Sequence, residues 1–171
     1  MPRDTDLHKA AYKGNANAVR VCIDEDGIDV NEFGAANRTA LHRAVASGSS
    51  EVVALLIERG ATVDIQDKSG RTPLHWAAVM DAVPCAELLV QAGAQLDKTS
   101  NTGSTPLHMA ADQGKRNFVM WALAHDADIS AMDNGGMTPY DLAKQNGHKD
   151  LAKLLKPGGG GDDICSSCCV M

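Results

Sequence analysis

The chain has 171 residues, a formal net charge of −6 and only 4% aromatic residues, although 44% of its residues are hydrophobic. This length suits one domain with a short extension. The acidity argues against a nucleic-acid ligand, because phosphate backbones attract basic surfaces. The shortage of aromatic residues is typical of cores built from Ala and Leu helices.

The amino-terminal residues 1–6 contain no apolar segment, so we expect no secretory signal. Pro2 occupies the position where N-myristoylation requires Gly. No stretch approaches the roughly 18 apolar residues of a membrane span. Cys22 and Cys85 lie singly in apolar helical patterns, unlike a disulfide framework. These features together predict a cytoplasmic protein.

A Thr-x-Leu-His element recurs along the chain and defines its period. The copies start 33 residues apart, except for the first interval of 34, at Thr5, Thr39, Thr72, Thr105 and, in degenerate form, Thr138. Two series of glycines keep the same spacing. A fixed period of this length indicates stacked structural repeats.

Each repeat predicts two helices and a turn. Thr caps the first helix and Pro takes its first position, as in 72–73. The Leu and Ala residues of 74–78 allow close packing, and a Gly such as Gly48 ends this helix in the left-handed conformation. A second helix with a Val/Leu face follows, as in 52–56. A polar turn such as 67–70 then leads to the next Thr.

Residues 70–78, Gly-Arg-Thr-Pro-Leu-His-Trp-Ala-Ala, together with the 33-residue period, resemble the ankyrin repeat. The resemblance covers about residues 4–156. It implies an all-α solenoid of stacked antiparallel helix pairs with β-hairpin-like finger loops, and protein recognition on the concave side. We expect an ankyrin-repeat domain over 1–156, a Gly-rich, Cys-containing tail over 157–171, and repeats at about 4–33, 34–66, 67–99, 100–132 and 133–156.

Several positions depart from the repeat pattern. Asp81 and Asp126 stand where other repeats have a turn Gly, and Asn37 stands at a finger Gly position. Asp and Asn tolerate positive φ better than most residues but less well than Gly, so slight strain is expected at the two Asp turns. Repeat one carries one extra residue, within 24–26.

One histidine recurs at the same place in each of four repeats, as His8, His42, His75 and His108. We expect each ring to hydrogen-bond the backbone of a neighbouring turn. Neighbouring rings would lie roughly 8–10 Å apart, too far to share a metal ion. The sequence also has no phosphate loop, nucleophile elbow or His-Glu-x-x-His motif. We therefore predict no catalytic, metal or cofactor-binding residues and no enzymatic activity.

In the ankyrin repeat, the residue after His and the two before the inter-helix Gly face the concave groove. Trp76 with apolar neighbours and a polar rim has the composition of an interface hot spot. The alternative is that Trp76 covers the next repeat and leaves no patch. The finger residues among the candidates would give specificity, or be ordinary solvated turns. The predicted partner-binding residues are Tyr12, Arg43, Arg71, Trp76, Val79, Met80, Asn101, Met109, Asp112 and Gln113.

The tail suits lipid attachment. Residues 168–171, Cys-Cys-Val-Met, fit the Cys-a-a-X prenylation box, and the terminal Met favours farnesyl. One prenyl chain gives only marginal membrane residence, so a palmitoyl group on Cys165 is the expected second anchor. The alternatives are a redox-labile free tail or a partial metal site. Prenylation is expected at Cys168.

Three functions fit these features. The first is a non-enzymatic adaptor or scaffold that binds another protein and is tethered to a cytoplasmic membrane face. The second is a soluble regulatory subunit or inhibitor that docks on one enzyme or large assembly. The third is a bacterial effector that its host prenylates. In each case the partner is a protein, with this chain a monomer or one part of a hetero-complex, and nucleic acid is not a partner.

Overall fold

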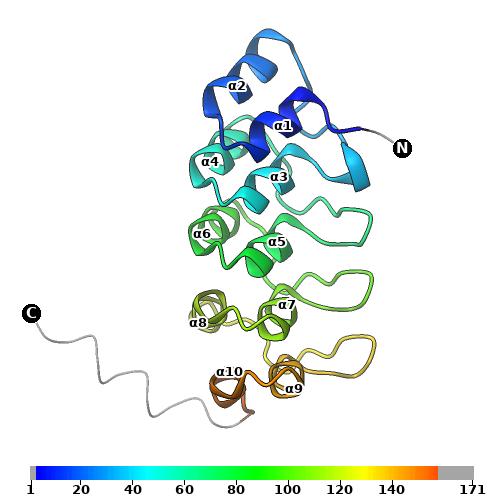
Figure 1. Cartoon of the computed structure of the whole chain (residues 1–171), viewed down its shortest axis with the longest axis vertical. Coiled ribbons are helices and arrows are strands. Elements are labelled where there is room, and N and C mark those ends of the chain that lie inside the picture. Colours follow the sequence, from blue (N-terminus) through cyan, green and yellow to red (C-terminus); the bar gives the residue numbers. More distant parts are fainter. Residues whose placement is uncertain (1–2, 158–171) are drawn as a thin grey trace, which may run out of the picture.

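The computed structural model describes residues 3–157, which form five helix pairs stacked in a single row (Figure 1). We number the repeats by these pairs. The inner helices are α1 (Asp6–Tyr12), α3 (Ala40–Ser47), α5 (Pro73–Met80), α7 (Pro106–Asp112) and α9 (Pro139–Gln145). The outer helices are α2 (Ala16–Arg20), α4 (Ser50–Glu58), α6 (Val83–Gln91), α8 (Arg116–Ala124) and α10 (Lys149–Leu154). The described part of the chain contains no strand, which confirms the predicted all-α solenoid.

The inner helices begin as the Thr and Pro pattern predicts. The backbone N–H of Thr72 donates to His75 Nδ1 at 3.1 Å, and the other inner helices begin with the same kind of box. Pro73, Pro106 and Pro139 open α5, α7 and α9. A Pro at this position loses no helical hydrogen bond and presets the helical φ.

The repeated histidines join each repeat to the next. Because Nδ1 accepts the Thr N–H, a neutral ring carries its proton on Nε2 and donates it to the finger of the following repeat. The bonds run from His8 to the carbonyl of Arg38 (2.9 Å), from His42 to Arg71 (3.1 Å), from His75 to Ser104 (3.0 Å) and from His108 to Met137 (3.0 Å). The prediction of a bond to a neighbouring turn is confirmed.

Repeat five has Asp141 where the other repeats have the histidine. Its carboxylate accepts the N–H of Thr138 at 3.0 Å and the Thr138 hydroxyl at 2.6 Å. These hydroxyl and backbone hydrogen bonds lower the pKa of Asp141. A carboxylate can cap the start of the helix, but it has no proton to donate to the finger of a following repeat. Repeat five needs no such donor, because no further finger follows α9 in residues 3–157.

The core runs without interruption through the stack. One Leu of each of the first four inner helices is fully buried at an equivalent position, at Leu7, Leu41, Leu74 and Leu107. Each contributes about 1.5–3 kcal/mol by burial. The alanines around them keep the inner helices close enough for the histidine bonds to form.

The positions that depart from glycine adopt the backbone that the pattern predicts. Asp81, Asp126 and Asn37 have φ values of 55°, 59° and 55°. Asp81 also bonds to the next repeat, since its carboxylate accepts the backbone N–H of Phe118 at 2.7 Å and the Asn117 amide at 2.8 Å. The substitution therefore fixes the start of α8.

The extra residue of repeat one is taken up by a π-helical turn, η1 (Val21–Glu25), that continues α2. A π turn holds one more residue than an α turn, so the insertion lengthens the outer helix locally without shifting the stack. Within residues 3–157, no helix has the length and apolar content needed to cross a membrane.

Candidate functional site

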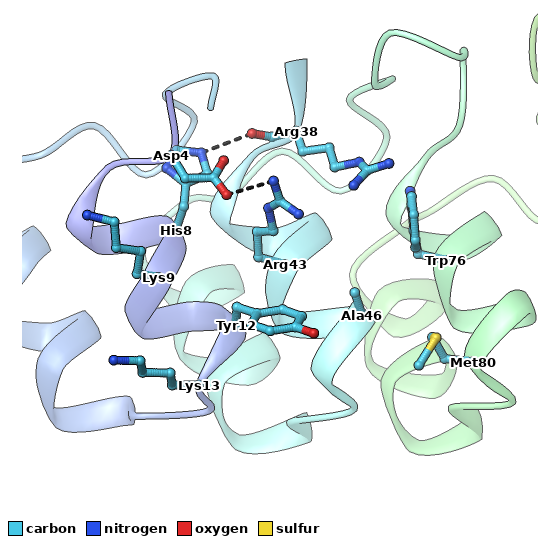
Figure 2. Close-up of a pocket in the computed structure, with 10 residues that line it drawn as sticks. All are labelled: Asp4, His8, Lys9, Tyr12, Lys13, Arg38, Arg43, Ala46, Trp76 and Met80. Carbon is cyan, nitrogen blue, oxygen red and sulfur yellow. Dashed lines mark hydrogen bonds and ion pairs between the residues drawn. The ribbon is translucent and has the colours of Figure 1, made fainter. Parts of the chain in front are cut away.

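Two hollows lie on the face formed by the inner helices and the fingers. The first hollow, of about 460 Å³, spans repeats one to three (Figure 2). It is lined by Asp4, His8, Lys9, Tyr12, Lys13, Arg38, Arg43, Ala46, Trp76 and Met80. The second hollow, of about 260 Å³, extends from the finger before α5 to α9. It is lined by Arg71, Thr102, Ser104, His108, Met109, Asp112, Gln113, Asp133 and Leu142.

The apolar part of the first hollow is a seat made of Tyr12, Ala46, Trp76 and Met80. Figure 2 shows the Tyr12 ring extending from α1 toward Ala46 of α3, with Trp76 and Met80 facing the same space from α5. Tyr12 is 59% exposed and Met80 is 48% exposed. Large apolar side chains left this accessible in a concave site favour a protein contact.

Trp76 is half-buried and held from two sides. Its indole N–H donates to the Asp67 carboxylate at 3.2 Å, and the Arg38 guanidinium lies 4.2 Å from the ring centroid. Both groups come from fingers, and Arg38 belongs to the preceding repeat. Trp76 thus packs partly against the core and keeps the rest of its ring toward the first hollow. It is a fixed wall of the first hollow.

The rim of the first hollow is basic. Lys9, Lys13, Arg38 and Arg43 line it, against the single carboxylate of Asp4. Asp4 pairs with Arg43 at 2.7 Å and accepts the backbone N–H of Ala35 at 2.9 Å. Lys9 forms an exposed pair with Asp6 at 2.9 Å, which water screens strongly. Asp67 lies 3.5 Å from Arg38 Nε, so three of the four cations have an acid beside them and the hollow keeps a small surplus of positive charge.

The acids that hold this arrangement stay ionised. Burial works to raise the pKa of Asp4, but the hydrogen bonds from Ala35 and Arg43 outweigh it, and the net pKa is lowered. For Asp67 the same opposition of burial and hydrogen bonds from the Arg71 and Ser69 backbone also ends in a lowered pKa. Charged Asp67 is only 6% exposed and fixes both its finger and Trp76.

The second hollow has a polar lining of the opposite charge. Its carboxylates are Asp112 and Asp133, against the single cation of Arg71. Asp112 accepts the Asn146 amide at 2.9 Å. Its predicted apolar member, Met109, lines the hollow but is only 9% exposed. Met109 therefore offers little accessible apolar surface to a partner in repeat four.

The remaining predicted residues are placed differently. Val79 is half-buried beside Met80, and Gln113 lies in the second hollow. Asn101 lines neither hollow. Its amide donates to the Lys68 carbonyl at 3.1 Å, and its backbone N–H donates to the Ser69 carbonyl at 3.1 Å. These bonds tie neighbouring fingers together, so the Asn101 side chain is structural.

Some lining residues were absent from the predicted set. Lys9 and Lys13 occupy the same concave positions as Trp76 and Met80, so the repeat register does place them in the groove, although they are not among the predicted partner-binding residues. Arg38 and Asp4 come from a finger and from the segment before α1, where the register gives no side-chain direction.

A family model for ankyrin repeats matches residues 7–100 and 93–166. This chain belongs to the ankyrin-repeat family. The repeats form a protein–protein interaction module, a kind of domain that is generally not enzymatic.

The ankyrin repeats also resemble segments of much longer proteins. Cortactin-binding protein 2 of Ornithorhynchus anatinus is 37% identical over 62 residues, which is 36% of this chain and 4% of that protein. E3 ubiquitin-protein ligase KEG of Arabidopsis thaliana is 41% identical over 63 residues, 37% of this chain and 4% of the ligase. BCL-6 corepressor-like protein 1 of Homo sapiens is 38% identical over 61 residues, which is 36% of this chain and 3% of that protein. This chain thus spans a twenty-fifth or less of each relative's length.

The ankyrin repeats contain no group of three His, Cys, Asp or Glu residues between positions 3 and 157 that is placed to hold a metal ion. Cys22 and Cys85 are buried, and burial raises the pKa of both thiols. A raised pKa keeps a thiol protonated and weakly reactive. The predicted lipidation sites, Cys165 and Cys168, lie outside the described residues.

Proposed function

We propose that this chain is a non-enzymatic adaptor that holds a segment of another protein in the first hollow. The observation that carries the proposal is the fixed position of Trp76, clamped between Arg38 and Asp67 at the wall of an accessible apolar seat. An aromatic side chain that is already ordered loses little conformational entropy when a partner covers it. Such a residue is suited to anchor an interface.

Capture experiments with the full chain test this proposal. Immobilised wild-type protein, Trp76→Ala and Leu142→Ala are incubated with the same eukaryotic lysate. Leu142 occupies the position of Trp76 in repeat five and lines the second hollow, so it is the matched control. Partners that are lost with Trp76→Ala and kept with Leu142→Ala support the first hollow. Equal capture by all three proteins contradicts it.

The proposal includes a lipid tether that places the adaptor on a cytoplasmic membrane face. Its support is the sequence pattern of residues 168–171 and the neighbouring Cys165. The test compares wild type with Cys168→Ser in eukaryotic cells, by membrane fractionation and by mass spectrometry of the carboxy-terminal peptide. A farnesylated peptide, and loss of the membrane fraction in the variant, support the tether. An unmodified peptide with unchanged fractionation refutes it and leaves the soluble regulatory subunit as the better description.

A further inference from the structure

We propose that the first hollow is selective for an acidic peptide segment that carries one apolar side chain. The inference rests on the proposed function and adds the chemistry of the bound segment. Two features carry it, namely the shape of the apolar seat and the sign of the charges around it.

The seat is a local depression in the row of inner helices. The equivalent position in the five repeats holds Tyr12, Ala46, Val79, Asp112 and Gln145. Ala46 has the smallest side chain of the five, so the row dips at repeat two between the Tyr12 ring and the side chains of Trp76 and Met80 (Figure 2). An apolar side chain inserted there is covered on several sides and gains about 25 cal/mol per Å² of apolar surface removed from water.

The charges around the seat select acids. The rim carries four cationic side chains, and three acids pair with them: Asp4 with Arg43, Asp6 with Lys9 and Asp67 with Arg38. The balance is still positive, on a chain whose net charge is −6. A basic site on an acidic protein raises the local concentration of negatively charged segments and repels positively charged ones. The second hollow has the opposite balance and lacks an accessible aromatic ring, so it does not compete for the same segment.

The two arginines of the rim have donors to spare. Arg43 uses Nη2 for Asp4, and Arg38 Nε lies 3.5 Å from Asp67 without the alignment of a hydrogen bond. Among the described residues, the buried Nε atoms of both arginines have no acceptor. The buried Nε atoms are closed to a ligand, so the Nη groups of the two guanidiniums would receive an incoming carboxylate, since the acids beside them use only part of their donors.

Other occupants fit less well. A bilayer is flat on this scale, whereas Ala46 lies at the bottom of a concavity. The chain's own residues 162–164, Asp-Asp-Ile, have the right chemistry. Seven residues beyond position 157 reach at most about 25 Å. Arg43 lies three repeats away from repeat five, which at roughly 10 Å per packed helix is about 30 Å. A segment of another protein is therefore the occupant that fits.

The test uses fluorescein-labelled nonapeptides and the full chain, with binding measured by fluorescence anisotropy. The probe is Glu-Asp-Glu-Asp-Leu-Asp-Glu-Asp-Glu. One comparison peptide replaces every acid by its amide, and a second replaces Leu by Gly. We expect each comparison peptide to bind about tenfold more weakly than the probe, which corresponds to about 1.4 kcal/mol. Raising the salt concentration should reduce this difference for the amide peptide, because the charge term is screened.

A matched pair of variants locates the binding. Ala46→Leu fills the seat and should weaken probe binding at least about tenfold, whereas Gln145→Leu makes the equivalent change in repeat five and should leave it unchanged. Ala, Gln and Leu are all strong helix formers, so neither variant should unfold the repeats. Thermal unfolding of each variant checks this point.

Several results would overturn the inference. These are equal binding of the three peptides, undetectable binding of the probe, or equal effects of Ala46→Leu and Gln145→Leu. Binding to phosphatidylserine vesicles that Ala46→Leu leaves intact, without peptide binding, would assign the basic rim to a membrane. Self-association that the probe displaces would assign it to a second copy. A captured partner lost with Trp76→Ala but bound through a neutral or basic segment would refute the inference while leaving the proposed function standing.

Discussion

The two hollows of the concave face share one scaffold but offer opposite chemistry. Both lie over inner helices that start with the same Thr box and pack through the same Leu and Ala residues. The first hollow has exposed Tyr12 and Met80, a clamped Trp76 and a basic rim. In the second, Met109 is buried and the accessible surface is polar and acidic.

This difference shows that one set of residues in each repeat stabilises the stack and another set determines what the groove can bind. The Leu and His residues that stack one repeat on the next recur in each of the first four repeats, so they specify no partner. The few positions that point into the groove vary freely because the stack does not depend on them. The exception is Trp76, where a groove residue is also held by the fingers.

Acid should destabilise the repeats that contain a buried histidine much more than repeat five, and this is the largest effect that we expect. Burial lowers the pKa of His42 and of His75 to about 4, from a value near 6.5 in the unfolded chain. Because the folded pKa lies below the unfolded one, stability is complete above about pH 6.5 and is lost as the pH falls toward 4. Between pH 7 and pH 5 we expect a loss of about 2 kcal/mol per histidine, measured by urea unfolding.

Two controls accompany the acid experiment. His75→Gln removes one titrating ring, so the loss between pH 7 and pH 5 should be about half as large, whatever the stability at pH 7. Hydrogen exchange should show repeats two and three losing protection before repeat five, which has Asp141 at the equivalent position. A stability that is constant from pH 7 to pH 5 would contradict the buried neutral histidines.

Equivalent finger acids should differ in their contribution to stability. Asp67 accepts the N–H groups of Ser69, Arg71 and the Trp76 ring, whereas Asp133 accepts only the backbone N–H groups of Gly135 and Met137. Asp67→Ala should lower the free energy of unfolding by about 2–3 kcal/mol and Asp133→Ala by about 1 kcal/mol. The difference arises because removing the buried carboxylate of Asp67 leaves more donors unpaired. Equal costs would mean that the clamp on Trp76 adds nothing.

Charge reversal should give the smallest effect. Lys13→Glu on the first hollow should weaken binding of the acidic nonapeptide by about threefold to tenfold and reduce its salt dependence, since an exposed cation contributes about 1 kcal/mol. Lys144→Glu changes the net charge equally but lies in repeat five, outside both linings. If both variants weaken binding alike, the effect is that of net charge and the basic rim has no local role.

Much of the fold followed from local rules. Thr before Pro, the small residues of the inner helices and the turn glycines each act within a few residues, so their pattern is visible in the sequence. The same is true of the left-handed backbone at Asp81 and Asp126. The second role of Asp81, capping α8 through Phe118, depends on a neighbour from the next repeat and could not be read locally.

The candidate site was only partly predictable. The repeat register placed Tyr12, Arg43, Trp76 and Met80 on the groove, and all four line the first hollow. The register gives the direction of a Cβ atom but not the path of a long side chain. It therefore missed the burial of Met109.

By itself, the sequence determined a stack of five helix pairs with a histidine row between them, because these features depend on short-range capping and on a fixed period. Only the tertiary structure decided which concave residues stay accessible. Trp76 is fixed by Arg38 from the preceding repeat and Asp67 from its own finger. The basic rim arises because Asp4 and four cations from three segments meet beside Ala46. Such proximity between segments exists only once the repeats have packed.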